Sequence, residues 1–349
     1  MSRDTFLSLI MRRVLKERTM GEGNNSKNMP EKYHPHPLVL MMVDVTTQES
    51  VCNACIQPIS PPYYRCSAQS ECNFLLHKFC ADLPLVISDS FYQSEFMASL
   101  ASPIWDEHIF SHFRCKFCHM YCNGFGYSYS ERISIVACLE CALAPKVIRH
   151  DSHRQHPLIL IGYCPFEASI SCCGNEHRFS LYVYNCSVCD YNIDIHCAFL
   201  PKTVTHKFDE HPLTLVFASS SQHHSDSTEC FCEFCEEDID PMYWFYHCAE
   251  CDQSFHVDCI PSLGKFSKIK FGTGTVKHPS HNDHPLSLVR MLSIGNQICG
   301  ICHYIIEGFE DGMALHCADC DFWIHFLCGD RFPEVQVTHP YMNFSFLPT

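Results

Sequence analysis

The sequence predicts a tandem array of small, metal-stabilised α+β modules, and three observations support this fold class. First, the 349 residues include 27 cysteines and 24 histidines, far more than an ordinary globular chain carries. Second, these residues recur as Cys-x-x-Cys and His-x-x-Cys pairs, the spacing that places two ligands on one tetrahedral metal ion. Third, the pairs return at intervals of roughly sixty residues, which is typical of a repeat protein.

The last cysteine of each His-x-x-Cys-like element marks the repeat. Five such cysteines define units 1 to 5 in chain order: Cys80, Cys141, Cys197, Cys259 and Cys328. A unit of roughly sixty residues buries too little apolar surface to offset its chain entropy, so we expect each unit to depend on metal. Alternating apolar residues such as Leu286 and Leu288 predict strands within the units.

The spacing also predicts the domain boundaries. We expect an N-terminal extension over residues 1–32 and units over 33–90, 104–150, 153–206, 208–278 and 281–340, with the second unit degenerate. The stretches Phe91 to Ser102 and Ala218 to Thr228 have the composition of linkers.

Charge and hydropathy argue against several classes of partner and location. Asp and Glu total 39 against 24 Lys and Arg, a formal net charge of -15, which repels nucleic-acid phosphates and anionic lipid headgroups. We therefore expect protein partners rather than nucleic acid, with lipid binding as a less favoured alternative. No apolar run is long enough for a transmembrane helix, and charges interrupt the first twenty residues, so we expect no signal peptide.

The cysteines are expected to be reduced. A secreted disulfide framework would favour an even cysteine count and fewer histidines than this chain carries. This pattern favours an intracellular protein, in the cytoplasm or the nucleus.

Units 4 and 5 show the fullest order of candidate ligands. Each has a His-Pro-Leu element, two Cys-x-x-Cys pairs, a His-x-x-Cys pair and a final histidine. Eight ligands in this order make two four-ligand sites in each unit. In unit 4 they are His211, Cys232, Cys235, Cys248, Cys251, His256, Cys259 and His278, and in unit 5 they are His284, Cys299, Cys302, Cys317, Cys320, His325, Cys328 and His339.

These elements resemble the divergent C1 domain of the plant cysteine/histidine-rich C1 domain family. The endings CNFLLHKFCADLP (Cys72 to Pro84) and CDFWIHFLC (Cys320 to Cys328) add to the resemblance, which covers roughly Tyr33 to His339. It implies C1-like cross-brace zinc fingers with short β-hairpins and a short helix each. It also implies that the first Cys-x-x-Cys joins the His-x-x-Cys pair, while the first His and the second Cys-x-x-Cys join the last ligand.

Carried over by position, the resemblance assigns two zinc sites to each of the last two units. The first sites are Cys232, Cys235, His256 and Cys259 in unit 4, and Cys299, Cys302, His325 and Cys328 in unit 5. The second sites are His211, Cys248, Cys251 and His278 in unit 4, and His284, Cys317, Cys320 and His339 in unit 5.

Units 1 and 2 depart from this pattern. Unit 1 keeps Cys52, Cys55, His77 and Cys80, but its second pair is widened to Cys66 and Cys72. Its first histidine is His34 or His36, and His36 is favoured because it belongs to the His-Pro-Leu element; Asp89 is a candidate last ligand. Unit 2 lacks the second pair, so we expect one four-cysteine site of Cys115, Cys118, Cys138 and Cys141. A redox dithiol of Cys138 and Cys141 is the alternative.

Unit 3 has a complete second site and a distorted first one. The second site is His156, Cys186, Cys189 and His206. In the first, adjacent Cys172 and Cys173 replace Cys-x-x-Cys, with Cys164 as a substitute, and Asp194 or His196 stands beside Cys197 in place of the ligand histidine.

The remaining residues of these types have structural interpretations. The spacing of His150, His153 and His156 could support another metal, but we interpret the extra histidines, His281 among them, as exposed or second-shell groups. Cys122, Cys164 and Cys230 are left without a metal. The assignments sum to at most about nine zinc ions.

The function expected from this pattern is a non-catalytic, zinc-binding interaction scaffold, which the resemblance places in plant signalling or stress response. A diacylglycerol-type lipid sensor is an alternative, but the Gln-Gly of lipid-binding C1 domains is absent. A PHD or RING finger would need a further Cys-x-x-Cys after the His-x-x-Cys element. A Cys-x-x-Cys thiol-redox protein is the last alternative, and we expect no enzyme.

Overall fold

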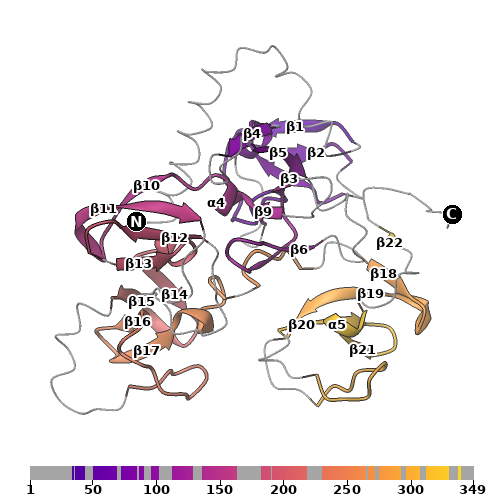
Figure 1. Ribbon diagram of the computed structural model, residues 1–349. Coiled ribbons are helices and arrows are strands. Elements are labelled where there is room, and N and C mark those ends of the chain that lie inside the picture. The colour runs from indigo at the N-terminus through magenta and orange to yellow at the C-terminus, as the bar shows by residue number, and fades with distance from the viewer. Residues whose placement is uncertain are drawn as a thin grey trace.

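The computed structural model describes a chain of small antiparallel sheets, each closed by one short helix (Figure 1). The described residues are 34, 36–43, 50–68, 72–84, 86–89, 96–101, 112–128, 136–162, 182–189, 191–217, 230–264, 266–271, 275–291, 296–306, 312–329 and 337–338. Cys164, Cys172, Cys173, His339, the first twenty residues and the linker expected at Ala218 to Thr228 lie outside them.

The sheets of units 1 and 2 follow the order of their strands in the chain. Unit 1 consists of β1 (Leu38–Met41), β2 (Tyr63–Cys66), β3 (Leu75–His77) and helix α3 (Lys78–Ala81). Unit 2 consists of β4 (Val86–Asp89), β5 (Phe96–Ala101), β8 (Gly126–Ser128), β9 (Val136–Cys138) and helix α4 (Leu139–Ala142), with a separate hairpin of β6 (Phe113–Arg114) and β7 (Tyr121–Cys122). Strand β5 lies within the stretch expected to be a linker, so that expectation is wrong there.

Units 3 to 5 repeat the same four-stranded meander and short helix. Unit 3 has β10 (Val147–His150), β11 (His153–Gly162), β12 (Tyr182–Cys186), β13 (Tyr191–Asp194) and the 3-10 helix η2 (Cys197–Phe199). Unit 4 has β14 (Thr203–His206), β15 (Asp209–Val216), β16 (Phe245–Cys248), β17 (Gln253–His256) and η4 (Val257–Cys259). Unit 5 has β18 (Thr275–His278), β19 (His281–Arg290), β20 (Met313–Cys317), β21 (Phe322–His325) and α5 (Phe326–Gly329), and β22 (Val337–Thr338) pairs with β18.

A tight turn of the same geometry contains the first cysteine pair in units 1, 2, 4 and 5. The residue after the second cysteine donates its N–H to the carbonyl of the first cysteine over 2.8 to 2.9 Å. That residue has a left-handed backbone, with φ between 56 and 62°. We call this element the knuckle turn, and its left-handed residues are Ile56, His119, Glu236 and His303. The turn brings the two cysteine side chains to one side of the loop.

A recurring tyrosine ties three of the sheets to the segment that precedes them. The hydroxyl groups of Tyr127, Tyr184 and Tyr246 donate to the carbonyls of Pro84, Pro145 and Pro201, each over 2.7 Å. Each tyrosine lies in the third strand of its sheet, and each proline lies just before the first strand. Unit 5 has Leu315 at this position, and the Arg290 guanidinium donates instead to the Pro261 carbonyl over 3.1 Å.

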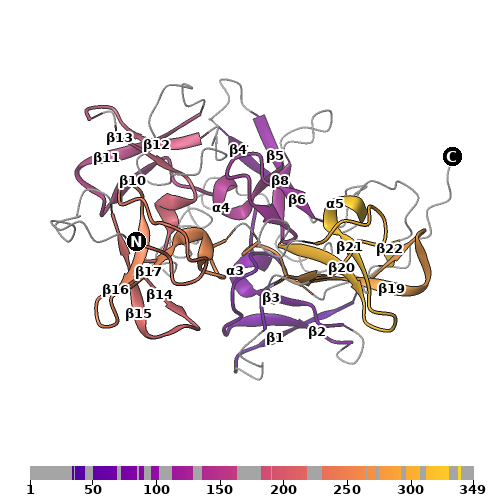
Figure 2. The same ribbon diagram turned by 90° about the horizontal axis from the view of Figure 1, so that it is seen from below.

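The buried side chains form two clusters. One runs through units 1 to 4, from Cys52 to Leu263, and the other, from Phe266 to Phe326, belongs to unit 5 and the segment before it. Figures 1 and 2 show units 3 and 4 on one side of units 1 and 2, and unit 5 on the other. Among the described residues, no helix is both long and apolar enough to cross a membrane.

Candidate metal centres

The candidate ligands gather into two kinds of four-atom group. We call a group an inner site when it joins the knuckle-turn cysteines to the two ligands at the start of the short helix. We call it an outer site when it joins two residues near the start of the sheet to the later cysteine pair. Among the described residues, eight groups of at least three candidate ligands have all their ligand atoms within 4.8 Å of one another.

The inner sites of units 1, 4 and 5 contain the ligands expected from the sequence. Cys52, Cys55, His77 and Cys80 form one group, and Cys232, Cys235, His256 and Cys259 form another. In unit 5, the Nδ1 atom of His325 lies 3.2 Å from the Cys302 Sγ and 3.9 Å from the Cys328 Sγ. The backbone N–H of His325 donates to the Cys299 Sγ over 3.4 Å, which brings the third sulfur of the site to the same place.

The inner-site histidines share one orientation. The Nε2 atoms of His77, His256 and His325 donate to the backbone carbonyls of Pro58, Asp238 and Ile305 over 3.0 to 3.1 Å. This hydrogen bond leaves Nδ1 deprotonated and directed at the sulfurs, as in metal-ligating histidines that donate their other nitrogen to an acceptor. The knuckle turn therefore positions the cysteines, and the carbonyl two residues after the turn fixes the histidine tautomer.

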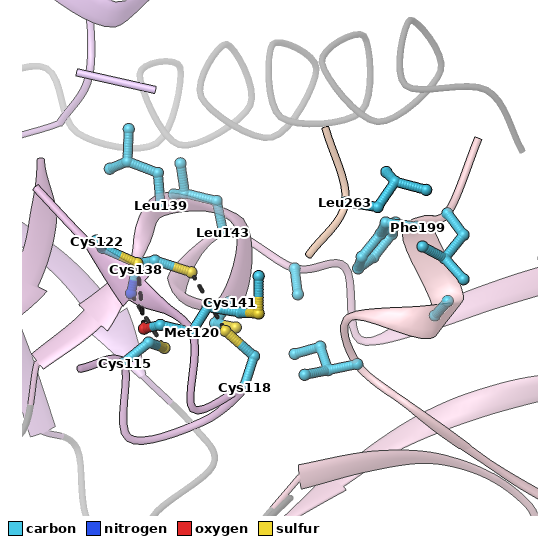
Figure 3. Close-up of a cluster of buried hydrophobic side chains, with 14 of the residues drawn as sticks. Cys115, Cys118, Met120, Cys122, Cys138, Leu139, Cys141, Leu143, Phe199 and Leu263 are labelled. Carbon is cyan, nitrogen blue, oxygen red and sulfur yellow. Dashed lines mark hydrogen bonds between the residues drawn. The ribbon is translucent and has the colours of Figure 1, made fainter. Parts of the chain in front are cut away.

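The inner site of unit 2 consists of four buried cysteines, as the sequence predicts. Cys115, Cys118, Cys138 and Cys141 converge beside helix α4 (Figure 3). The Sγ atoms of Cys118 and Cys138 lie 3.8 Å apart, about the sulfur–sulfur edge of a tetrahedron with zinc–sulfur bonds of about 2.3 Å.

A buried lysine from a distant segment contacts this four-cysteine site. Lys268 belongs to residues 266–271, between units 4 and 5, and its Nζ lies 3.2 Å from the Cys138 Sγ and 2.5 Å from Glu140 Oε2. Burial opposes the charged form, but the thiolates of Cys118 and Cys138 and the Glu140 carboxylate outweigh burial and raise the pKa of Lys268. Four thiolates around one dication carry two net negative charges, and Lys268 offsets part of them. No motif in the sequence indicates this contact.

The same segment is held by two asparagines from other units. The Asn123 side chain donates to the Lys270 carbonyl over 2.9 Å and accepts from the Lys270 N–H over 2.8 Å. The Lys270 ammonium donates to Asn53 Oδ1 over 2.9 Å. Residues 266–271 therefore connect units 1 and 2 to the start of unit 5.

The cysteines of one inner site do not share one pKa. The pKa of Cys232 is lowered to about 3, mainly by a hydrogen bond from Cys259. In the same site, a hydrogen bond with Cys232, followed by burial, raises the pKa of Cys259 well above its ordinary value. Because ligating cysteines are thiolates, zinc binding displaces the protons held at the raised positions, and acid opposes it.

The outer sites contain a pair of histidines that the sequence analysis assigned differently. In unit 1, His34 and His36 both join Cys66 and Cys72, and His34 Nε2 lies 3.4 Å from the Cys72 Sγ. In unit 3, His153 and His156 join Cys186 and Cys189. His34 and His36, expected as alternatives, therefore both belong to the ligand group of unit 1. In unit 3, His153 is the fourth member of the group, where the sequence led us to expect His206. The side chain of Asp89 lies outside the described residues.

Strand pairing places His206 and His278, the last ligands expected for units 3 and 4, in the first strands of the sheets that follow. His206 lies in β14 and pairs with Asp209 across the turn to β15, and His278 lies in β18 and pairs with His281. Both histidines therefore start the sheet that follows them. The His-x-x-His-x-x-His spacing of residues 150, 153 and 156 is the signal in the sequence, and the structure places His153 and His156 in one ligand group.

The outer sites of units 4 and 5 are defined by short distances. The Nδ1 of His211 lies 3.1 Å from the Cys251 Sγ, and the Cys251 N–H donates to the Cys248 Sγ over 3.4 Å. In unit 5, the Nδ1 of His284 lies 2.9 Å from the Cys320 Sγ, whose pair partner is Cys317. These contacts bring together His211 with Cys248 and Cys251, and His284 with Cys320, as the sequence predicts.

Asp194 has a structural role at the start of η2. Its Oδ1 accepts hydrogen bonds from the backbone N–H groups of His196 and Cys197, over 2.6 and 3.3 Å. Asp194 occupies the strand position that His256 and His325 occupy in units 4 and 5, since each lies opposite the first or second residue of the preceding strand. Its expected partners Cys172 and Cys173 lie outside the described residues.

Two cysteines interpreted as non-ligands pack in the core. Cys122 is buried beside the four-cysteine site and donates to the Met120 carbonyl over 3.5 Å, and Cys230 is half-buried. The third, Cys164, lies outside the described residues.

The ligand groups fit zinc. A tetrahedral ion with bonds of 2.0 to 2.3 Å separates its ligand atoms by about 3.3 to 3.8 Å, close to the sulfur–nitrogen distances above. His36 and His153 of the outer sites each have a buried ring nitrogen without a hydrogen-bond partner, which a coordinated ion would supply. The same holds for His281 of unit 5, which pairs with His278 as His153 pairs with His150. The chain therefore binds several zinc ions, each held by four protein atoms.

Comparison with known families agrees with this assignment. The family model described as C1 domain matches residues 32–81, 206–260 and 279–329, which correspond to units 1, 4 and 5. The second match begins at His206 and the third just after His278, in agreement with the strand pairing. No curated protein and no solved structure gives a significant match.

Proposed function

We propose that the chain, three segments of which match the C1-domain family model, is a non-catalytic scaffold for protein partners in intracellular signalling or stress response. Its zinc ions fold the units, and its surface carries the binding activity. A plant setting follows from the resemblance to divergent C1 domains. The cytoplasm or the nucleus is the proposed location, because both keep cysteines reduced.

The observation that carries the proposal is that protein atoms fill the coordination positions of the metal sites. Five of the groups each bring four protein atoms within 4.8 Å of one another, as in structural zinc sites, whereas a catalytic zinc keeps one position for water or substrate. The metal therefore supplies cross-links between segments rather than a Lewis acid for chemistry. On this ground we also propose that the chain is not an enzyme.

Exposed apolar side chains around the knuckle turn of unit 5 support a protein partner. Ile298 and Ile305 face each other across an isolated bridge and are 58 % and 53 % exposed, and Tyr304 between them is 75 % exposed. Apolar residues grouped on a surface mark interaction sites, and an aromatic residue with a polar tip suits a protein interface. The net charge of -15 disfavours an anionic membrane or nucleic acid as the partner of this surface.

The test is partner capture with a matched surface variant. Zinc-loaded protein and the variant Tyr304→Ser/Ile305→Ser would each be cross-linked to binding proteins in cells, and each captured protein would be measured again as a purified pair. We expect a partner that binds the parent chain and loses at least tenfold in affinity with the variant, while zinc content is unchanged. A Tyr64→Ser variant, which changes a half-buried tyrosine in β2 of unit 1, is the control for a general loss of fold.

Two other outcomes would contradict the proposal. Sedimentation with vesicles containing diacylglycerol, abolished by the same variant, would identify a lipid sensor. Disulfide reduction or isomerisation by the zinc-loaded chain, lost with Cys138→Ser, would identify a thiol-redox protein.

A further inference from the structure

The outer site of unit 4 differs from those of units 3 and 5 in one ligand position. His153 pairs with His150 across the turn between the first two strands of unit 3, and His281 pairs with His278 in unit 5. In unit 4 the equivalent pair is His206 with Asp209. A carboxylate therefore stands where the other two units have an imidazole.

A second difference accompanies the first. The rings of His34, His153 and His281 stack on Phe74, Tyr191 and Phe322, with interplanar angles of 13° in all three. Each aromatic residue lies two positions after the second cysteine of its outer site. Unit 4 has Gln253 there, and a carboxylate offers no ring to stack on. The exchange of His for Asp thus coincides with the loss of its aromatic support.

Asp209 lies among the other ligand atoms of its site. Its Oδ1 is 3.4 Å from the Cys251 Sγ and 3.3 Å from His211 Nδ1, and these two atoms are 3.1 Å apart. Three donors of different chemistry therefore converge on one point. Their mutual distances are those of ligands on a single ion.

The second carboxylate oxygen of Asp209 is also consistent with a bound cation. The Asp209 side chain is 0 % exposed, and its Oδ2 is buried without a hydrogen-bond partner. An anionic oxygen removed from water without a compensating partner is unfavourable. A dication at the convergence point offsets that cost.

We propose that Asp209 is a zinc ligand with His211, Cys248 and Cys251, and that this outer site is the first to release its metal. Zinc is a borderline-soft ion, for which thiolate and imidazole are better donors than a single carboxylate oxygen. Solvent access would not make the three outer sites differ in zinc release, because each has one exposed cysteine: Cys189, Cys251 or Cys320. The donor at one position is what separates unit 4 from units 3 and 5.

A purely structural role for Asp209 makes a different prediction. Its Oδ1 also accepts the His211 N–H over 2.8 Å, an interaction that an asparagine retains and a histidine does not. If Asp209 only braces the turn, Asp209→Asn is neutral and Asp209→His is harmful. If Asp209 is a ligand, the order is reversed, because asparagine is a poor zinc donor and histidine restores the Cys2His2 set of unit 3.

The experiment follows each cysteine separately in the full chain. The zinc-loaded protein is mixed with EDTA and a thiol-alkylating reagent, and labelling of each cysteine peptide is timed by mass spectrometry. In the parent chain we expect Cys248 and Cys251 to be labelled before Cys186, Cys189, Cys317 and Cys320. Asp209→Asn should accelerate labelling of Cys248 and Cys251 about tenfold, and Asp209→His with Gln253→Tyr should slow it about tenfold.

The control is Asp252→Asn, which removes a carboxylate that is 99 % exposed on the turn after Cys251. It should leave the labelling order unchanged. Labelling of Cys251 no earlier than Cys189 and Cys320 in the parent chain would overturn the proposal, and that result requires no variant to fold. An unchanged rate in Asp209→Asn together with faster labelling in the histidine variant would assign Asp209 to the turn alone.

Discussion

The inner and outer sites use similar residues and hold the molecule together in different ways. None of the described inner-site cysteines is exposed, whereas the outer sites of units 3 to 5 each have one exposed cysteine: Cys189, Cys251 or Cys320. The inner site joins the knuckle turn to the short helix, so its ligands are part of the core. The outer site joins two turns at the end of the sheet. For units 3 to 5, we therefore predict that the inner sites determine folding and that the outer sites stabilise an already folded edge of the sheet.

The largest difference is expected when one cysteine of each kind is replaced. Cys118→Ser should lose one zinc ion and the tertiary structure of unit 2, because structural zinc supplies about 10 kcal/mol or more of apparent folding free energy in small modules. Cys320→Ser should lose one zinc ion and keep the core of unit 5. Native mass spectrometry and limited proteolysis measure both effects. Equal protease sensitivity of the two variants would show that the two kinds of site do not differ.

Removal of the lysine beside the four-cysteine site should have the next largest effect. Lys268→Met leaves Glu140 and the anionic metal site without their buried cation, and breaking a buried pair in this way costs about 3 kcal/mol. Urea unfolding monitored by circular dichroism measures the loss. The control Lys116→Met changes an exposed lysine of the same knuckle turn and should be nearly neutral. A neutral Lys268→Met would mean that the site needs no counter-charge.

The tyrosine contacts allow a smaller test of the junctions between units. Tyr246→Phe removes the hydroxyl that donates to the Pro201 carbonyl and should lower the free energy of unfolding by about 1 kcal/mol. The exposed Tyr304→Phe is the matched control and should have no effect on stability. Unit 5, where Leu315 replaces the tyrosine, is expected to open first in hydrogen exchange. Simultaneous opening of all five units would contradict this.

The smallest predicted effect concerns the left-handed residue of the knuckle turn. Glu236 is exposed and has a φ of 62°, which L-residues other than glycine adopt at a cost of about 1 kcal/mol. Glu236→Gly should therefore raise the free energy of unfolding of unit 4 by a few tenths of a kcal/mol, after the entropic cost of glycine. Its neighbour Glu237 does not have a positive φ, so Glu237→Gly should be destabilising.

Local spacing made the cysteines and the inner sites predictable. Two ligands on one knuckle turn and two at a strand–helix junction have fixed separations in the sequence, so the pattern identifies them directly. The outer histidines were not predictable in the same way, because His150, His153 and His156 are evenly spaced. The pairing of His150 with His153 in the sheet separates His150 from His153 and His156, which join Cys186 and Cys189.

The spacing of residues in the sequence could not predict contacts between distant units. Lys268 meets Cys138 from 130 positions along the chain, and nothing near either residue indicates the contact. The linker expected at Phe91 to Ser102 contains β5 because its residues complete the sheet of unit 2. Tyr184 and Tyr246 each stand two positions before a cysteine in the sequence, but the proline carbonyl that each contacts depends on the fold.

The most direct test is the zinc content of the purified chain by native mass spectrometry, with circular dichroism before and after chelation. The account predicts about eight zinc ions, one for each described ligand group, and unfolding when they are removed. Partial chelation should first remove outer-site ions with little change in the spectrum. Near-zero zinc in a chain that keeps its structure, with oxidised cysteines, would contradict the central claim.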